Sequence, residues 1–201
     1  MGPPDLWHQK REFQFAFVRQ TGLQPAHRFL DLGCGCLRGG IPIIAYLERG
    51  HYTGVDVRPE AIGEARKELA EAGLVDQQPS LICCRDVSDL DLPEAFDYVW
   101  AFSVLIHLRD QVLDGALDFV ARHLAPHGVF FANVNLGEPA DHRWREFPLV
   151  WRPYAFYEDA FQRHGMRVAD VGALKDYGHV TRHQDASLAA AQRMLRAIAA
   201  R

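Results

Sequence analysis

The sequence predicts an α/β protein with helices on both faces of a mostly parallel sheet. Segments with the apolar spacing of helices alternate with short, almost wholly apolar segments along most of the 201 residues. Such apolar segments are typical of strands in a parallel sheet that is covered on both faces. A glycine-rich turn, residues 33–40, follows the first strand and leads into a helix. This order is typical of doubly wound folds that bind nucleotide-like ligands.

The first half of the chain alternates helices and strands with clear boundary residues. Asp5 is the expected N-cap of the first helix, and Pro59 suits the first turn of the third. Gly50 and Gly73 stand where the second and third helices should end. The expected helices are residues 5–21, 39–49 and 59–72, and the expected strands are residues 28–32, 52–56 and 80–84.

The second half continues this alternation up to the fifth strand and then becomes less regular. Residues 136–152 are expected to form an irregular loop, because they combine two prolines with scattered tryptophans and arginines. An alanine-rich final helix is expected over residues 184–201. The other expected elements are strands over 96–102, 129–134 and 166–172, helices over 110–125 and 154–164, and a further strand near 178–182.

Composition and charge limit the class of protein and its partners. With 48% hydrophobic residues the chain can bury one substantial core, so a single domain over residues 1–201 is expected. The formal net charge is −4 and the 22 lysines and arginines are dispersed, so no nucleic-acid partner is expected. No apolar run approaches the roughly 20 residues of a membrane span, and charged residues interrupt the N-terminus. A cytoplasmic protein without membrane partners is expected.

The cysteines do not indicate a metal site or a disulfide. They form one Cys-x-Cys pair and one adjacent pair, and neither spacing matches a zinc site. Adjacent strand residues point to opposite faces, and cytosolic thiols stay reduced. Small buried residues beside a turn and within a strand are therefore expected at Cys34, Cys36, Cys83 and Cys84.

Polar residues follow several of the predicted strands. Ligands of open α/β sheets bind outside the carboxyl ends of the strands, where the strand order reverses. Asp31, Asp56 and Asp86 stand at three successive strand ends, and Ser103 follows the fourth. A carboxylate in front of the glycine turn would repel a pyrophosphate, but it suits a ligand with an ammonium and a sulfonium. S-adenosylmethionine carries both groups.

On these residues the chain resembles the class I S-adenosylmethionine-dependent methyltransferases of the small-molecule type, over residues 25–175. The resemblance implies a Rossmann-like, doubly wound, mostly parallel seven-stranded sheet with an antiparallel terminal strand and helices on both faces. It also implies S-adenosylmethionine as cofactor and S-adenosylhomocysteine as product. The segment from Phe29 to Gly35 matches the family's first motif, whose acid and glycines bracket the methionine end of the cofactor.

The same resemblance assigns roles to the remaining strand ends. Asp56 would accept both ribose hydroxyls, and Asp86 with Val87 would recognise adenine. The segment from Ser103 to Leu108 would border the sulfonium and the methyl acceptor. The expected cofactor-binding residues are Asp31, Gly33, Cys34, Gly35, Arg38, Asp56, Val57, Asp86, Val87 and Ser103.

The first motif departs from the family pattern at one position. Leu37 stands where a third glycine is common, and Arg38 follows it at a helix N-terminus, where a positive charge is locally unfavourable. A bound carboxylate would offset that cost, so Arg38 is expected near the methionine carboxylate. The alternative is a surface arginine on a tight turn. Local turn or cap chemistry is likewise the alternative for Asp31, Asp56 and Asp86.

The residues around the reaction are less clearly specified. Methyl transfer is an in-line displacement that needs a base only when the acceptor carries a proton to lose. His107 is the expected catalytic base, and a solvent-facing or helix-capping histidine is the alternative; His179 and Tyr154 are weaker candidates. The first helix, within residues 1–24, is expected to cover the cofactor. The expected acceptor-side residues, whose alternative is ordinary packing, are Trp7, Trp144, Trp151 and Tyr154.

The overall prediction is a methyltransferase that acts on an O, N or C nucleophile of an aromatic or acidic small molecule. The alternatives are a protein or nucleic-acid methyltransferase, a cofactor-binding protein that does not methylate, and a nicotinamide dehydrogenase on fold analogy alone. The apolar stripe of the final helix is expected to pack on its own domain or, as a homodimer, on a second copy of the chain.

Overall fold

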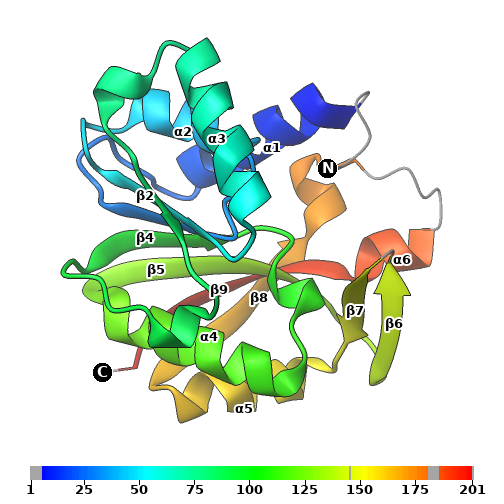
Figure 1. The fold of residues 1–201 in the computed structure, drawn as a ribbon. Coiled ribbons are helices and arrows are strands. Elements are labelled where there is room, and N and C mark those ends of the chain that lie inside the picture. The colour runs from blue at the N-terminus through cyan, green and yellow to red at the C-terminus, as the bar shows by residue number, and fades with distance from the viewer. Residues whose placement is uncertain (1–5, 145, 181–185, 201) are drawn as a thin grey trace.

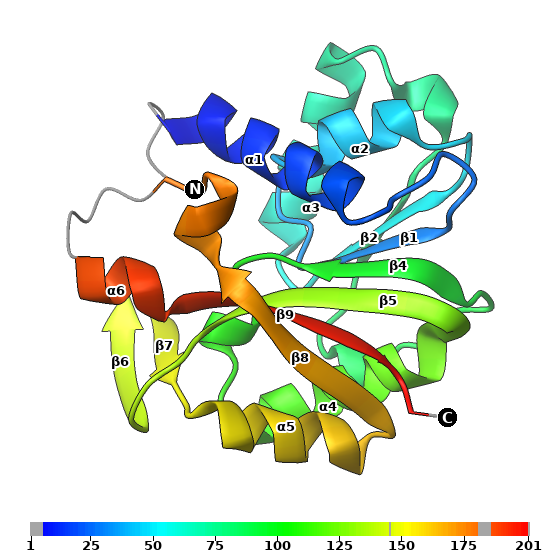
Figure 2. The same ribbon diagram turned by 180° about the vertical axis from the view of Figure 1, so that it is seen from behind.

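The computed structural model describes residues 6–144, 146–180 and 186–200. Seven strands form one sheet in the order β3-β2-β1-β4-β5-β9-β8 (Figures 1 and 2). Strands β1 to β5 are parallel to their neighbours in this group, whereas β9 is antiparallel to both β5 and β8. The predicted mostly parallel, doubly wound sheet of seven strands with an antiparallel last strand is confirmed.

The element boundaries agree with the sequence prediction for most of the chain. The helices are α1 Trp7–Gln20, α2 Gly40–Tyr46, α3 Pro59–Glu71, α4 Asp110–His123, α5 Tyr154–Arg163 and α6 Ala186–Ala191. The strands are β1 Phe29–Leu32, β2 Tyr52–Asp56, β3 Ser80–Cys83, β4 Phe96–Ala101, β5 Leu124–Asn135, β6 Ala140–Trp144, β7 Phe147–Trp151, β8 Met166–Ala173 and β9 Gln192–Ala199. Short 3-10 helices are η2 Val75–Gln77, η3 Val87–Asp89, η4 Leu105–His107 and η5 Leu174–Tyr177.

Two apolar layers lie on opposite faces of the sheet. Helices α1, α2 and α3 cover one face, and α4 and α5 cover the other (Figure 1). Because side chains alternate along a strand, Tyr98 and Trp100 of β4 pack in the first layer, whereas Val99 and Ala101 pack in the second. The central strands are therefore buried on both faces, which explains why they read as continuous apolar segments.

Helix α1 packs on the sheet through an apolar stripe that includes two phenylalanines. Phe13, Phe17 and Val18 are buried at helical spacing, and the Phe17 ring lies 5.5 Å from that of Trp100. Burial of each such phenylalanine is worth about 1.5–3 kcal/mol. The predicted N-cap, Asp5, lies outside the described residues. None of the described helices combines the length and the apolar content that a bilayer span requires.

The predicted final helix over residues 184–201 is wrong for most of its length. Within its described residues 186–200, Ala186–Ala191 is helical, and Gln192–Ala199 forms β9, which pairs with both β5 and β8. Met194, Leu195 and Ala197 are buried in the core, so sheet pairing overrides the helix propensity of the alanines. Of the apolar side chains that suggested a second copy of the chain, Met194 and Leu195 are buried within this one, whereas Ala191 and Ile198 are half-buried. The strand expected near 178–182 is absent from its described residues 178–180.

The predicted irregular loop over residues 136–152 is a β-hairpin. Strands β6 and β7 pair antiparallel, with Ala140 opposite Trp151 and Trp144 opposite Phe147. Arg152 fixes the base of the hairpin: its Nε donates to Asp110 Oδ1 of α4 at 3.0 Å and its Nη1 to Asp141 Oδ1 at 2.7 Å. A two-stranded hairpin is marginal by itself, so this anchor on α4 explains how it persists.

Candidate cofactor and acceptor site

The predicted polar strand ends lie along one edge of the sheet. β1 lies between β2 and β4, so the strand order reverses there and the carboxyl ends of these strands are adjacent. Asp31 lies near the end of β1, Asp56 ends β2, and Ser103 follows β4 closely. The structure therefore brings these three predicted residues together at a topological switch point.

The glycine turn is tied to β2 by its backbone. Gly33 has φ +74°, and its N–H donates to the Val55 carbonyl at 2.7 Å. A Cβ on Gly33 would lie 2.4 Å from Cγ2 of Val104, so the close approach of β4's end also requires glycine. Gly35 has φ +56°, and its N–H donates to Asp56 Oδ2 at 2.9 Å. Hydrogen bonds thus join the glycine turn directly to the end of β2 and to Asp56.

Two non-glycine residues at this edge have left-handed backbones. Leu37, at the position of the family's third glycine, has φ +60° and is fully buried. Ser103 has φ +59°, and its N–H donates to Oδ1 of Asn133, a buried residue of β5, at 2.6 Å. Such backbones cost about 1–3 kcal/mol each and persist where surrounding contacts hold them. Sequence reasoning missed Asn133, because nothing local to β5 marks its long-range bond.

Asp31 is held beneath the turn rather than on the surface. Its side chain is buried, and Tyr52 of β2 donates its hydroxyl to Asp31 Oδ2 at 2.6 Å. Burial raises the pKa of Asp31 to about 7; the Tyr52 hydrogen bond opposes this rise, and the nearby Asp56 charge adds to it. A Cβ on Gly40 would lie 2.5 Å from the Tyr52 hydroxyl oxygen, so this glycine makes room for the bond. Tyr52 was not among the predicted site residues.

Asp56 accepts four hydrogen bonds within the protein. Its Oδ1 accepts from the backbone N–H of Arg58 at 2.9 Å and from Arg58 Nε at 3.1 Å. Its Oδ2 accepts from Gly35 and from Arg58 Nη2 at 3.2 Å. The Arg58 guanidinium also lies over the ring of Phe147 in the hairpin, 5.8 Å from its centroid. A ligand that binds Asp56 must therefore displace the half-exposed Arg58 side chain.

Residues that follow β2 and β3 are more open. The Val57 side chain is 52% exposed although it directly follows a buried strand, so an apolar surface is available beside Asp56. Asp86 caps η3, with Oδ1 accepting from the Ser88 N–H at 2.9 Å and hydroxyl at 2.8 Å, and these bonds lower its pKa. Asp86 Oδ1 therefore makes the local cap contacts that were the alternative to ligand binding. Its Oδ2 has no hydrogen-bond donor among the described residues. The Val87 side chain packs on the core.

Arg38 lies between the glycine turn and α1. Its guanidinium is 5.6 Å from the Trp7 ring centroid, and its carbonyl accepts from Arg11 Nε at 2.9 Å. Arg38 Nε is buried and has no hydrogen-bond partner among the described residues. Burial lowers the pKa of Arg38. Trp7 thus lies against Arg38, next to the glycine turn, rather than on the hairpin.

His107 is held against the hairpin. Its Nδ1 lies 2.6 Å from the Pro148 carbonyl oxygen of β7, so Nδ1 carries the proton and Nε2 the lone pair. Burial lowers the pKa of His107, the Pro148 bond opposes this, and the charge of Arg58 lowers the pKa further. His107, Phe147 and Arg58 therefore connect the end of β4 to the hairpin and to Asp56.

The other predicted acceptor-side residues are placed differently. Trp151 lies in β7, with its ring 5.1 Å from His142. Tyr154 begins α5 and donates its hydroxyl to the Val168 carbonyl of β8 at 3.0 Å, so it stays apart from the strand ends. Trp144 ends β6, and its side chain lies outside the described part of the structure.

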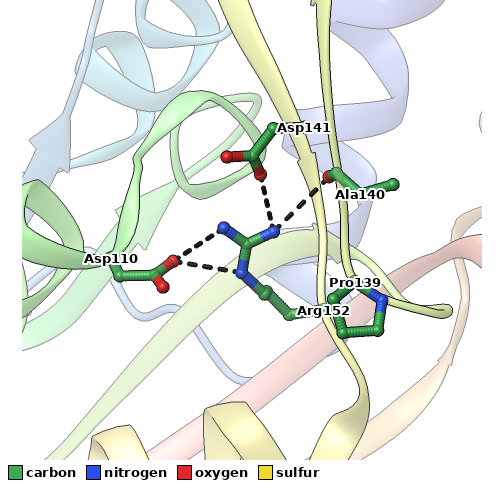
Figure 3. A pocket seen from close by; sticks show the side chains of 5 residues that line it. All are labelled: Asp110, Pro139, Ala140, Asp141 and Arg152. Atoms are coloured by element: carbon green, nitrogen blue, oxygen red, sulfur yellow. Dashed lines mark hydrogen bonds and ion pairs between the residues drawn. The ribbon is translucent and has the colours of Figure 1, made fainter.

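A surface hollow of about 430 Å³ lies at the base of the hairpin and is distinct from the strand-end site. Figure 3 shows that the Arg152 guanidinium lies inside it, between Asp110 and Asp141. These carboxylates already satisfy Arg152, so this cation is unavailable to an anionic ligand. We therefore place the candidate site at the strand ends of β1, β2 and β4.

Burial differs among the cysteines: Cys34 is buried, Cys36 and Cys84 are half-buried and Cys83 is exposed, so the expected burial is wrong for Cys83. All four are free, and burial, with the charges of Asp31 and Asp56, raises the pKa of Cys34 far above its usual range. Cys34 therefore lines the turn as an uncharged small residue. Within the described ranges, no group of three histidine, cysteine or acidic side chains is arranged to hold a metal ion.

Comparisons with known proteins agree with this geometry. The chain is 33% identical over 110 residues to the ubiquinone biosynthesis O-methyltransferase of Aeromonas salmonicida (strain A449), a match that covers 54% of this chain and 43% of the relative. A relative of the same description from Xylella fastidiosa (strain 9a5c) is 28% identical over 137 residues, 66% of this chain and 52% of that protein. The chain thus spans about half the length of these curated relatives.

Solved structures share the fold at low sequence identity. The CcbJ methyltransferase from Streptomyces caelestis has a TM-score of 0.73 at 15% identity, over 100% of this chain and 92% of that one. The predicted Rossmann-like methyltransferase fold is confirmed by this similarity.

A family model described as a methyltransferase domain matches residues 30–130, half of the chain. The matched region begins in β1 and includes the glycine turn, Asp56, Asp86 and His107. The resemblance inferred from these residues is thereby confirmed, and the chain belongs to the methyltransferase domain family.

Proposed function

We propose that this chain binds S-adenosylmethionine at the strand ends of β1 to β4 and transfers its methyl group to a small-molecule nucleophile. The observation that carries the proposal is the hydrogen bond that joins Gly35 of the glycine turn to Asp56 at the neighbouring strand end. Family membership supports it, as does a fold shared with a glycopeptide N-methyltransferase, MtfA, complexed with (S)-adenosyl-L-methionine (TM-score 0.69, 18% identity).

The residues at the strand ends suit the parts of this cofactor. Asp56 would accept the two ribose hydroxyls in place of the Arg58 guanidinium, which is half exposed and would have to turn outward. The exposed Val57 side chain would pack against adenine, and Asp86 Oδ2 would accept from its amino group. Asp31 would lie near the methionine ammonium, and the unpaired Nε of Arg38 near the carboxylate.

Little acid–base chemistry is required of the protein. The bound cofactor supplies a methyl group on a sulfonium, whose thioether is a good leaving group. The protein holds acceptor and methyl group in line and excludes water, which can supply much of the acceleration. For an acceptor that loses a proton, His107 is the base, because its lowered pKa keeps it uncharged at pH 7 with a lone pair on Nε2.

An Asp56→Asn substitution should weaken S-adenosylhomocysteine binding about 100-fold, since charged hydrogen bonds of about 1.5–3 kcal/mol are replaced by weaker ones. Isothermal titration calorimetry measures the change. Arg58→Ala is the matched control, because it removes the other partner of the same ion pair. We expect equal or up to about fivefold tighter binding by that variant, as it loses only a competitor for the carboxylate.

The two variants separate a ligand-binding acid from a structural ion pair. If the pair mattered only for the shape of the turn, both substitutions would weaken binding to a similar extent. Equal losses would therefore contradict the role of Asp56. Wild-type protein that gives no heat and no thermal shift with millimolar S-adenosylhomocysteine would contradict the proposed function itself.

A His107→Gln substitution should lower kcat about 100-fold or more with an acceptor that must lose a proton, which is the usual range for a lost general base. S-adenosylhomocysteine affinity should stay unchanged. The wild-type rate should be flat above pH 6.5 and fall at lower pH, because His107 must be deprotonated and its pKa lies below the usual value. Turnover assays on a panel of phenols, carboxylic acids and amines provide the measurement, and unchanged kcat in a folded variant removes His107 from the mechanism.

A further inference from the structure

Three basic side chains from distant parts of the chain lie along one side of α1 near the glycine turn. The His179 ring packs on Phe13 at 5.0 Å and Arg38 lies 5.6 Å from the Trp7 ring centroid, and Phe13 and Trp7 each stand three residues from Lys10. Lys10 lies in α1, Arg38 follows the turn, and His179 follows η5. Helix α1 and η5 lie side by side in both views (Figures 1 and 2), with the Phe17 ring 5.0 Å from that of Tyr177. Burial lowers the pKa of Lys10, and the charge of Arg38 lowers it further. Burial, together with the charges of Lys10 and Arg38, lowers the pKa of His179 to about 4. We call these three residues the basic cluster.

The basic cluster has no carboxylate partner among the residues that the structure describes. No described acid forms an ion pair with Lys10 or Arg38, whereas the adjacent Arg11 pairs with Glu68 at 3.3 Å. Arg38 Nε is buried without a hydrogen-bond acceptor. Two largely buried cations without an anion are unfavourable, and this arrangement is typical of a site whose anion comes from a ligand.

One carboxylate from the cofactor would not balance this charge. In the proposed function that carboxylate lies at Arg38, but S-adenosylmethionine also brings an ammonium and a sulfonium, so it adds net positive charge. Asp31 offsets at most one of these charges. Among the described residues no carboxylate balances the Lys10 ammonium in the cofactor complex, which points to the other ligand of the site, the methyl acceptor, as the source of a second anion.

The surroundings of His179 indicate what carries that anion. Its ring packs edge-on against Phe13 at 5.0 Å and Phe102 at 5.5 Å, and both phenylalanines are buried. Phe102 directly precedes Ser103 at the end of β4, where the acceptor is expected. Uncharged at pH 7, His179 offers an N–H donor within an aromatic wall. An acceptor with an apolar body and an anionic end matches this combination.

We propose that Lys10 and His179 bind an anionic group, a carboxylate or a phosphate, on an apolar methyl acceptor. The inference rests on the proposed function and deepens it by naming the substrate class. Arg38 serves the cofactor in this arrangement, and Lys10 and His179 serve the acceptor. The site would therefore take its second ligand only in ionised form.

The test uses simple probes on the protein already saturated with S-adenosylhomocysteine. Benzoate, phenyl phosphate and the uncharged benzamide are titrated by calorimetry or ligand-observed NMR. Benzoate or phenyl phosphate should bind at least about tenfold more tightly than benzamide, and the stronger of the two identifies the anionic group. Lys10→Met and His179→Gln should each reduce that binding about tenfold while changing S-adenosylhomocysteine affinity less than about threefold.

Arg19→Met is the matched control, because it removes one positive charge from the last turn of the same helix, where Arg19 is exposed. It should change neither probe binding nor S-adenosylhomocysteine binding. Far-UV circular dichroism confirms that each variant is folded, and His179→Gln carries the test should Lys10→Met fail to fold.

Three results would overturn the inference. Equal binding of benzoate, phenyl phosphate and benzamide would remove the anion site and leave the proposed function standing. Loss of S-adenosylhomocysteine affinity in Lys10→Met as large as the loss of probe affinity would assign Lys10 to the cofactor instead. Wild-type protein that does not bind S-adenosylhomocysteine would contradict the proposed function, and with it this inference.

Discussion

A Leu195→Asp substitution is expected to prevent folding. Leu195 is 1% exposed in β9, opposite Ala132 of β5 and Asp170 of β8. The change removes apolar burial worth about 1.5–3 kcal/mol and leaves a carboxylate in the core at a further cost of several kcal/mol. Together these losses match the total stability of a typical domain, about 5–15 kcal/mol. Urea unfolding followed by circular dichroism should show no cooperative transition.

Arg196→Asp is the control for this experiment. Arg196 is the next residue of the same strand and is exposed. Its unfolding midpoint should stay close to that of the wild type. A wild-type transition for Leu195→Asp would contradict the burial of Leu195 in the core.

An Asp31→Asn substitution should stabilise the ligand-free protein at pH 8 by about 4 kcal/mol, because the folded pKa of Asp31 is about 7 against 3.8 for the unfolded chain. The native state holds this proton more tightly than the unfolded chain does. Its contribution is therefore complete below pH 3.8 and is lost as the pH rises to about 7. Asparagine does not ionise, and its carbonyl can still accept from the Tyr52 hydroxyl.

The measurement is the free energy of unfolding of both proteins from pH 4 to pH 8. Taking the difference between the two proteins cancels the titration of all groups that they share. This difference should be near zero at pH 4 and should grow up to about pH 7. The same variant should bind S-adenosylhomocysteine about tenfold more weakly, since the proposed carboxylate for the ammonium is gone. A constant difference across this pH range would show that Asp31 does not carry the raised pKa.

The sequence was sufficient for the sheet and for its ligand edge because both depend on local patterns. Apolar strands of four to six residues separated by helical segments specify a parallel sheet with helices on both faces. The carboxyl ends of such strands share one edge, so the sequence alone predicts that Asp31, Asp56 and Ser103 lie close together. The sequence also showed that Leu37 replaces a common glycine, and the structure shows that this leucine has the positive φ that glycine adopts more easily.

What the sequence could not supply depends on partners far along the chain. The segment that forms β9 follows the alanine-rich residues 186–191 and was therefore predicted to continue their helix, whereas pairing with the open edges of β5 and β8 makes it a strand. Tyr52 and Asn133 act through single hydrogen bonds across strands, and neither has a local signature. The hairpin depends on Arg152 reaching Asp110, a contact that spans 42 residues. The basic cluster likewise joins residues near the two ends of the chain.

The place of β9 also restricts the order in which the molecule can assemble. β9 is made after β8 but lies between β8 and β5, so β8 has no partner in the sheet until residues 192–199 are available. During synthesis on the ribosome, the edge of β5 therefore stays unpaired while α5, β8 and the segments after them emerge. An unpaired apolar edge is a template for association with other chains. The nascent protein is thus most exposed to aggregation just before its last strand is complete.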